Sequence, residues 1–294
     1  MLPTIDTLVP LSFAMGTAIA FSVSTLLVRL GVERSDPMTA LLVTLSVNVV
    51  LLWTVSAALY GVVVDLSTWK YFIVAGLFAP GLGRLCNYTG IRRLGVTISY
   101  PISNTNPMIA VLVALLVLDE SLSLTGFAGA SAVVTGGVLV GSTSTSGAVR
   151  AGDRWAIAFP VLAAVFFGGA QVLRDVGLNG TVEPTVGAAV NSTTSLVLLG
   201  SYAVFTGRHR TLTVTWRDGW LFVVAGIVSS VGTALLYMAL RAGSVVIVAP
   251  ILNTSPLFAL LISYRLLRNH ELFSLRIVFG TLLVVIGVTT LAVV

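Results

Sequence analysis

Long runs of apolar residues follow one another along most of the chain, with short polar segments between them. A helix needs about 20 apolar residues to cross the hydrocarbon core of a membrane. The pattern predicts ten spanning helices, at residues 9–31, 38–61, 70–91, 95–118, 122–141, 155–176, 185–206, 217–240, 244–267 and 273–293. The runs are continuously apolar rather than alternating, which excludes the strands of a membrane barrel. The predicted fold class is an all-α polytopic membrane protein.

Composition supports this prediction. Hydrophobic residues make up 56% of the 294 residues and charged residues only 9%, which is too apolar for a soluble domain of this length. No basic residue precedes the first apolar run, so we expect it to remain as a helix rather than be cleaved as a signal peptide. The net charge of +5 comes from arginines scattered over short loops, which indicates loops held at the cytoplasmic face rather than nucleic-acid binding.

One segment of the chain occurs twice. Residues 88–107, "YTGIRRLGVTISYPISNTNP", match residues 237–256, "YMALRAGSVVIVAPILNTSP", at nine of twenty positions without a gap, at a constant offset of 149. This is an internal repeat. Further pairs extend it, namely Arg29 with Arg174, Pro37 with Pro184, Gly129 with Gly280 and Gly136 with Gly287. The polar segment near the midpoint divides the chain into a first five-helix repeat (1–144), a linker (145–153) and a second five-helix repeat (154–294).

An odd number of helices in each repeat makes the second copy enter the membrane from the opposite face, so we expect inverted-topology repeats. Loop charges give the same result. Basic residues follow the first and third helices of the first half but the second and fourth helices of the second half, so that in an inverted arrangement one face carries twelve Lys or Arg residues and the other three. Cytoplasmic loops are the basic ones, which places both termini outside. Inverted repeats with interrupted helices are typical of secondary transporters, whose substrate lies where the halves meet.

The second half resembles the tandem EamA-domain proteins of the drug/metabolite transporter superfamily. It shares a Tyr-x-x-Ala-Leu start, Pro-Leu-Phe in the ninth span, Glu271 at the start of the tenth and a closing Gly. The first half repeats the pattern from Tyr88 through Pro107 to Gly136, so the resemblance covers nearly the whole chain. It implies a basket of ten helices that moves small organic molecules, often amino acids or other metabolites outward. It also implies that both termini lie in the cytoplasm, which is opposite to the orientation that the loop charges predict.

Spans 4 and 9 share the pattern Pro-Ile-x-Asn-Thr-x-Pro in their interiors. Proline lacks an N–H and disturbs the preceding turn, so the helix is expected to bend at Pro101, Pro107, Pro250 and Pro256. Both asparagines lie about ten residues, or roughly 15 Å, into their spans. We expect substrate to contact Asn104, Thr105, Asn253 and Thr254. The alternative is that the amides only link neighbouring helices. Three further amides within the spans, Asn48, Gln171 and Asn191, are expected to link helices rather than to bind substrate.

Span 3 carries Arg84, Asn87 and Tyr88, which share one helix face. These three residues and Tyr237 of the second half are the other candidate substrate contacts. An arginine so far from the span ends is costly unless it faces water or a partner. We expect Arg84 to face the pathway and attract an anionic group such as a carboxylate; the alternative is a buried pairing with Asn or with backbone carbonyls. Tyr237 matches Tyr88 in the repeat, and the two are expected as aromatic walls or packing residues. Glycine-rich stretches such as "GLFAPGLG" indicate close helix packing.

All eleven acidic residues fall in loops or at span ends, so a proton relay lacks a carrier within the membrane. No span pairs Ser with His, contains His-Glu-x-x-His or faces two Asp residues, so the protein is expected to be no enzyme and to need no metal or cofactor. The predicted function is a monomeric carrier in the plasma membrane, an exporter or exchanger of a small organic metabolite such as an amino acid or organic anion. Its expected partners are that substrate and the lipid bilayer, without nucleic acid. A small-solute channel and a non-transporting scaffold are the alternatives.

Overall fold

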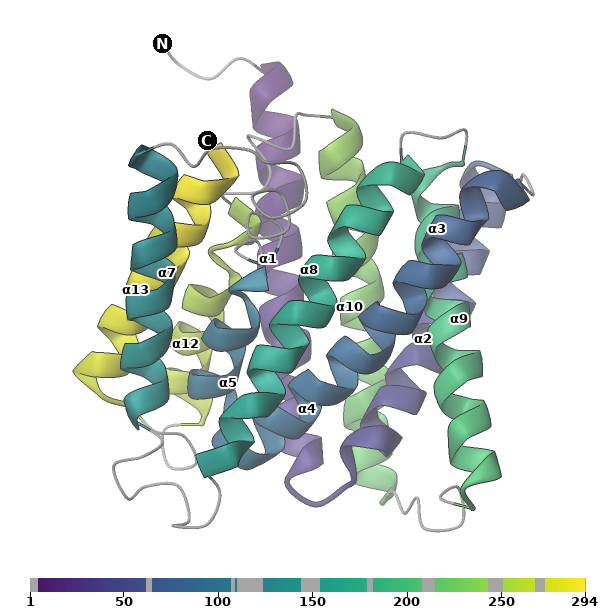
Figure 1. The fold of residues 1–294 in the computed structure, drawn as a ribbon. Coiled ribbons are helices and arrows are strands. Elements are labelled where there is room, and N and C mark those ends of the chain that lie inside the picture. The colour runs from purple at the N-terminus through teal and green to yellow at the C-terminus, as the bar shows by residue number, and fades with distance from the viewer. Residues whose placement is uncertain are drawn as a thin grey trace.

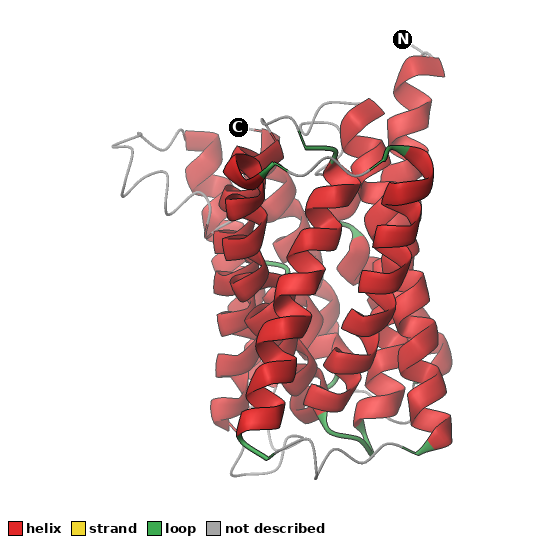
Figure 2. Cartoon of the chain, turned by 90° about the vertical axis from the view of Figure 1, so that its right-hand side faces the viewer, coloured by secondary structure: helices red, strands yellow, loops and turns green. Residues whose placement is uncertain are grey.

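The computed structural model describes residues 5–61, 65–106, 109, 124–143, 154–178, 182–207, 215–242, 251–267 and 273–293. These residues form a bundle of helices without a strand among them (Figure 2). The helices lie roughly side by side along one direction, and α1 begins at the end of the bundle where α13 ends (Figure 1). The predicted all-α class is therefore confirmed.

The helices follow the order of the apolar runs. Their bounds are α1 Ile5–Val32, α2 Pro37–Leu59, α3 Leu66–Gly76, η1 Leu77–Leu82, α4 Gly83–Leu94, α5 Val96–Ser103, α7 Leu124–Thr143, η3 Arg154–Ile157, α8 Ala158–Leu178, α9 Pro184–Phe205, α10 Trp216–Ala242, α12 Ser255–Leu266 and α13 Leu275–Val293. Within the described ranges, four helices are long and apolar enough to cross a membrane, namely α1, α2, α9 and α10. Predicted spans 4 and 9 lie partly outside the described residues.

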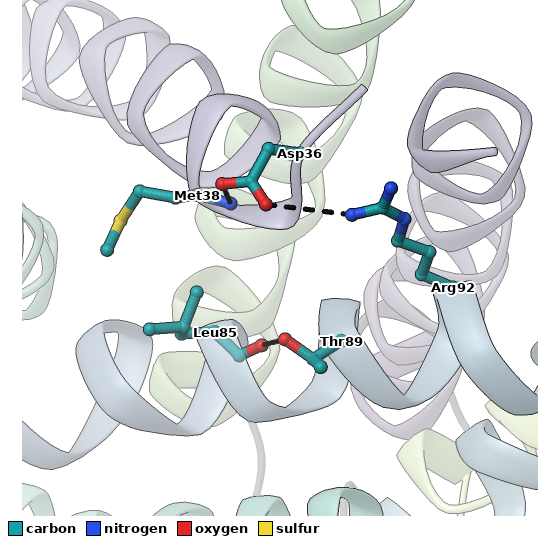
Figure 3. A network of polar contacts seen from close by, with 5 residues as sticks. All are labelled: Asp36, Met38, Leu85, Thr89 and Arg92. Atoms are coloured by element: carbon teal, nitrogen blue, oxygen red, sulfur yellow. Dashed lines mark hydrogen bonds and ion pairs between the residues drawn. The ribbon is translucent and has the colours of Figure 1, made fainter. Parts of the chain in front are cut away.

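The second helix begins at a side-chain cap that also ties it to α4. Asp36 accepts a hydrogen bond from the backbone N–H of Met38, and Pro37 fills the first helical position, where its missing N–H costs nothing. An oxygen of the Asp36 carboxylate lies 3.6 Å from Nη1 of Arg92, in the last turn of α4 (Figure 3). Opposite charges thus join the α1–α2 connection to the end of α4.

The third predicted span is not one continuous helix. Between α3 and α4 lies η1, a π-helical segment in which Ala79 has extended angles, φ −148° and ψ 130°. The first half has fourteen residues from Ala75 to Tyr88, whereas the second has thirteen from Ala225 to Tyr237, where α10 continues unbroken. One inserted residue is what a π-bulge accommodates. The sequence-based interpretation of "GLFAPGLG" as close helix packing is confirmed at Gly76 and Gly83, where a Cβ atom would lie 2.6 Å from the Asn191 carbonyl oxygen and 2.9 Å from the Phe167 ring. The break at Ala79 was not predicted.

Helices α7 and α13 pack through glycine. A Cβ atom on Gly136 would lie 2.5 Å from the carbonyl oxygen of Gly280, and one on Gly287 would lie 2.6 Å from that of Gly129. As residue numbers rise along α7, those of the contacted residues fall along α13, so the two helices run antiparallel. Small residues allow this close approach of backbones, and the helices lie side by side in Figure 1.

Contacts between the halves also occur in matched pairs. Gly31 of α1 lies against the Phe222 ring of α10, and Gly177 of α8 lies against the Phe72 ring of α3. The equivalent second helices each donate a hydrogen bond to a glycine carbonyl. One such bond is Asn48 Nδ2 of α2 to Gly226 O of α10, 3.0 Å; the other is Ser195 Oγ of α9 to Gly76 O of α3, 2.6 Å. Each of these two contacts made by one half therefore has a counterpart made by the other.

Candidate substrate-binding cavity

A cavity of about 280 Å³ lies among helices from both parts of the chain. This volume is near the lower limit of the roughly 300–1,000 Å³ typical of small-molecule sites. Its apolar lining residues are Phe21, Ala79, Pro80, Phe167, Ala188 and Leu236. Its polar and charged lining residues are Ser24, Thr25, Arg84, Asn87, Tyr88, Tyr100, Ser103, Asn104, Asn106, Arg174, Asn191, Ser192, Ser229, Thr233 and Tyr237. The polar and charged groups in this lining can bind a solute that carries charge or several hydrogen-bonding groups, and its apolar residues can contact the rest of that solute.

The structure brings five of the eight predicted substrate contacts to this cavity. They are Arg84, Asn87, Tyr88, Asn104 and Tyr237. The lining does not include Thr105, Asn253 or Thr254. Of the predicted bending prolines, Pro101 lies within α5 and Pro256 in the first turn of α12, whereas Pro107 and Pro250 lie outside the described residues, as does Glu271.

Both Asn-Thr pairs stand where a helix is interrupted. Helix α5 ends at Ser103, and Asn104 and Thr105 form a turn; Asn253 and Thr254 form the turn that precedes α12. The hydroxyl of Thr105 donates to the carbonyl of Ile102, and that of Thr254 donates to the carbonyl of Ile251, at 2.8 and 2.6 Å. These bonds satisfy carbonyl groups at the interruptions.

Arg84 reaches the cavity from α4, two residues after the π-helical segment ends at Leu82. Its Nη1 donates to Oδ1 of Asn48, 2.7 Å away, while Nδ2 of Asn48 lies 2.9 Å from the hydroxyl oxygen of Ser229 and 2.6 Å from that of Ser230. Asn48 is 2% exposed, so this amide is a buried link between α2, α4 and α10. The amide is neutral and orients the guanidinium without cancelling its charge.

Arg174, which the sequence analysis did not assign to the site, lines the same cavity. It lies within α8, and its Nη2 donates to the carbonyl oxygen of Ala79, 2.6 Å away. Ala79 is the extended residue of the break in the third span, so Arg174 bonds a carbonyl that is not part of a regular helix there. Its repeat partner Arg29 instead pairs with Glu33, at 3.3 Å.

Two of the lining amides, Asn106 and Asn191, were not assigned to the site by the sequence analysis. Asn106 follows the predicted pair in "SNTNP", and only its position beside Asn104 hinted at a role. Asn191 was predicted to link helices, as was Asn48; it is 2% exposed, and its Oδ1 has no hydrogen-bond partner within the described part of the chain. The side chain of Gln171, the third amide of that prediction, is outside the described set.

Charge in the described lining is of one sign. It contains Arg84 and Arg174 but neither Asp nor Glu. Away from bulk water, such cations attract anions strongly, because the effective dielectric constant is lower. Among the residues that the structure describes, no three His, Cys, Asp or Glu side chains gather closely enough to hold a metal ion. The arrangement can therefore bind a small anionic group and offers hydrogen bonds to its remainder.

Comparison with known proteins agrees with this architecture. A protein of Archaeoglobus fulgidus described as an uncharacterized transporter is 26% identical over 233 residues, which are 79% of this chain and 78% of that protein. A crystal structure shares the fold with a TM-score of 0.64 at 17% identity, covering 94% of each chain. The sequence profile of the EamA-like transporter family matches residues 8–142 and 154–293. Members of this family are transporters rather than enzymes, and the match spans both halves. The chain is a helical membrane protein that belongs to the EamA-like transporter family.

Proposed function

We propose that the protein is a secondary carrier for a small organic metabolite with an anionic group, such as an organic anion or an amino acid. The observation that carries this proposal is the cavity of about 280 Å³ whose described lining includes Arg84 and Arg174 but no acidic residue. Such a site can attract an anion out of water, and its size suits a small solute. The direction is outward or exchange, across the plasma membrane.

Alternating access between two inverted five-helix repeats, residues 1–144 and 154–294, is the proposed mechanism. The antiparallel pair α7 and α13 supports inversion, because these helices occupy equivalent places in the two repeats. Matched contacts such as Asn48 with Gly226 and Ser195 with Gly76 support a two-fold relation of the halves. The cavity lies among helices of both, so rocking of one half against the other opens it to either side in turn.

Interrupted helices supply the points at which such rocking can occur. The third span breaks at Ala79 and the fourth at Asn104, and both residues line the cavity. The ninth breaks at Asn253 beside α12. A helix without a continuous hydrogen-bond ladder bends at low cost, so the residues at the breaks can move with the substrate. Bending at Pro101, Pro107, Pro250 and Pro256, with substrate contacts at Thr105, Asn253 and Thr254, belongs to this proposal.

Thermal unfolding of the detergent-purified protein against amino acids, organic acids and sugars tests the proposal. A ligand that binds only the folded state stabilises it by about 2.7 kcal/mol at a hundred times its dissociation constant. We expect a shift confined to anionic or zwitterionic compounds, which Arg84→Ala and Asn104→Ala abolish. Thr54→Ala, at an exposed position of α2, is the control and should keep the full shift. A shift that survives both cavity variants would contradict the site.

Saturation separates a carrier from the alternatives. Reconstituted in vesicles, a carrier should show flux that saturates with substrate and that an unlabelled competitor reduces. Flux that rises linearly with concentration would indicate a channel. Absence of flux, with ligand binding intact, would indicate a scaffold.

A further inference from the structure

The geometry points to a more specific substrate, a small organic dianion whose two anionic groups bind Arg84 and Arg174 separately. This inference rests on the proposed function, because it takes the cavity to be the substrate site. It adds a charge requirement at that site and assigns Arg174 as a specificity-determining residue.

The two arginines come from different halves of the molecule. Arg84 extends from α4 in the first half, next to the break in the third span, and Arg174 extends from α8 in the second. Both line the same cavity of about 280 Å³. A ligand with an anionic group at each end can therefore contact a cation of either half at the same time.

Neutral oxygens orient both side chains. The Asn48 amide oxygen lies 2.7 Å from Nη1 of Arg84, and the Ala79 carbonyl oxygen lies 2.6 Å from Nη2 of Arg174. A guanidinium has five N–H donors in a fixed plane, and a bond to a neutral acceptor helps to set its direction without itself cancelling the charge. Both cations are thus prepared for an anion before it arrives, which lowers the entropic cost of binding.

Repulsion between like charges distinguishes a dianion from a monoanion. Two guanidinium groups on one small cavity repel each other, and the described lining holds no carboxylate to offset them. A monoanion places negative charge beside one guanidinium, whereas a dianion places it beside both and so reduces their repulsion further. Charge-assisted bonds to carboxylate are also stronger than neutral ones, so the second anionic group contributes substantially.

The test uses ligands of one skeleton and different charge. Succinate, succinamate and succinamide carry two, one and no negative charges at neutral pH. Their dissociation constants are measured by calorimetry on the purified full-length protein at constant ionic strength. Malonate and glutarate, each with its monoamide, cover shorter and longer spacings. We expect at least one dicarboxylate to bind about ten times more tightly than its monoamide, the usual gain from one added charge-assisted contact.

Variants then identify which residues produce the preference for a dianion over a monoanion. Arg84→Gln and Arg174→Gln should each reduce the preference for dianion over monoanion to about three-fold or less, because one cation remains. Arg84→Lys and Arg174→Lys keep the charge and should keep a preference, at weaker affinity. Arg29→Gln is the matched control, since Arg29 is the repeat partner of Arg174 but pairs with Glu33 and is absent from the lining. It should leave the preference unchanged.

Three results would overturn the inference. Equal binding of each dicarboxylate and its monoamide, lost in both Gln variants, would show a site for a monoanion and leave the proposed anion carrier standing. A preference that persists in Arg174→Gln, in protein with a cooperative unfolding transition, would remove Arg174 from the site. If no dicarboxylate binds, the dianion inference falls; if amino acids and monocarboxylates also fail to bind, the proposed function falls with it.

Discussion

Asn48 illustrates how one buried amide can support a charged site. Its oxygen accepts from Arg84, and its nitrogen lies within hydrogen-bond distance of the Gly226 carbonyl and of the hydroxyl oxygens of Ser229 and Ser230. Inside a membrane protein, an unpaired polar group costs free energy because neither lipid nor packed side chains can replace its partner. Asn48 is therefore both a link between three helices and the group that orients Arg84.

Replacement of Asn48 by alanine should lower the unfolding free energy by about 2 to 3 kcal/mol, because buried acceptors and a buried guanidinium lose their partner together. Thermal unfolding in detergent measures the effect as a melting temperature lower by several degrees. Ser46→Ala is the control on the same helix, since Ser46 is exposed and its hydroxyl donates to the Leu42 carbonyl within that helix. It should change stability by less than about 0.5 kcal/mol. Equal melting temperatures for Asn48→Ala and the unmodified protein would show that water replaces the amide.

At the scale of helices, contact between α7 and α13 depends on the absence of a side chain at Gly136. A Cβ atom there would lie 2.5 Å from the Gly280 carbonyl oxygen and 2.7 Å from the Val284 nitrogen, both of them backbone atoms. Gly136→Ala should therefore force the helices apart and lower stability by about 1 to 3 kcal/mol. Gly137→Ala is the matched control, because a Cβ atom at Gly137 meets nothing within 4 Å.

Gly137→Ala should leave the stability unchanged or raise it slightly, since alanine favours a helix by up to about 1 kcal/mol over glycine. The melting temperatures of the two variants, measured side by side, give the comparison. A loss of the same size in both would mean that the glycine content of α7, rather than its contact with α13, sets the stability.

Hydropathy predicted where most helices lie but not where they break. Hydropathy predicts a single span over 70–91, and the break at Ala79 follows from one residue inserted relative to the second half, which only a gapped comparison of the halves reveals. Arg174 was missed for a similar reason. The repeat aligns Arg174 with Arg29, yet Arg29 forms an ion pair with Glu33, whereas Arg174 donates a hydrogen bond to the Ala79 carbonyl at the cavity. Equivalent positions acquired different surroundings, and those depend on tertiary contacts that no local pattern records.

For the whole molecule, the repeat and the loop charges lead to one expectation about topology. The C-terminal ends of α2 and α9 are equivalent positions in the two repeats, marked by the cap residues Tyr60 and Thr206. Inversion places these ends on opposite sides of the membrane. The basic residues Arg208, Arg210 and Arg217 follow Thr206 in the sequence, so the charge bias places that end in the cytoplasm and Tyr60 outside.

Cysteine labelling in intact cells tests both statements. Cys86, the only cysteine, is first replaced by serine, and cysteine is then introduced separately as Tyr60→Cys and Thr206→Cys. Both positions are exposed, so each should react with a maleimide that has access to its side of the membrane. With an impermeant maleimide we expect Tyr60→Cys to react directly and Thr206→Cys to react only after permeabilisation. The reverse result would keep the inversion and place the termini in the cytoplasm, as the family resemblance implies. Reaction of both positions from the same side would contradict inverted repeats, and with them the proposal that two opposed halves expose one cavity to alternate sides.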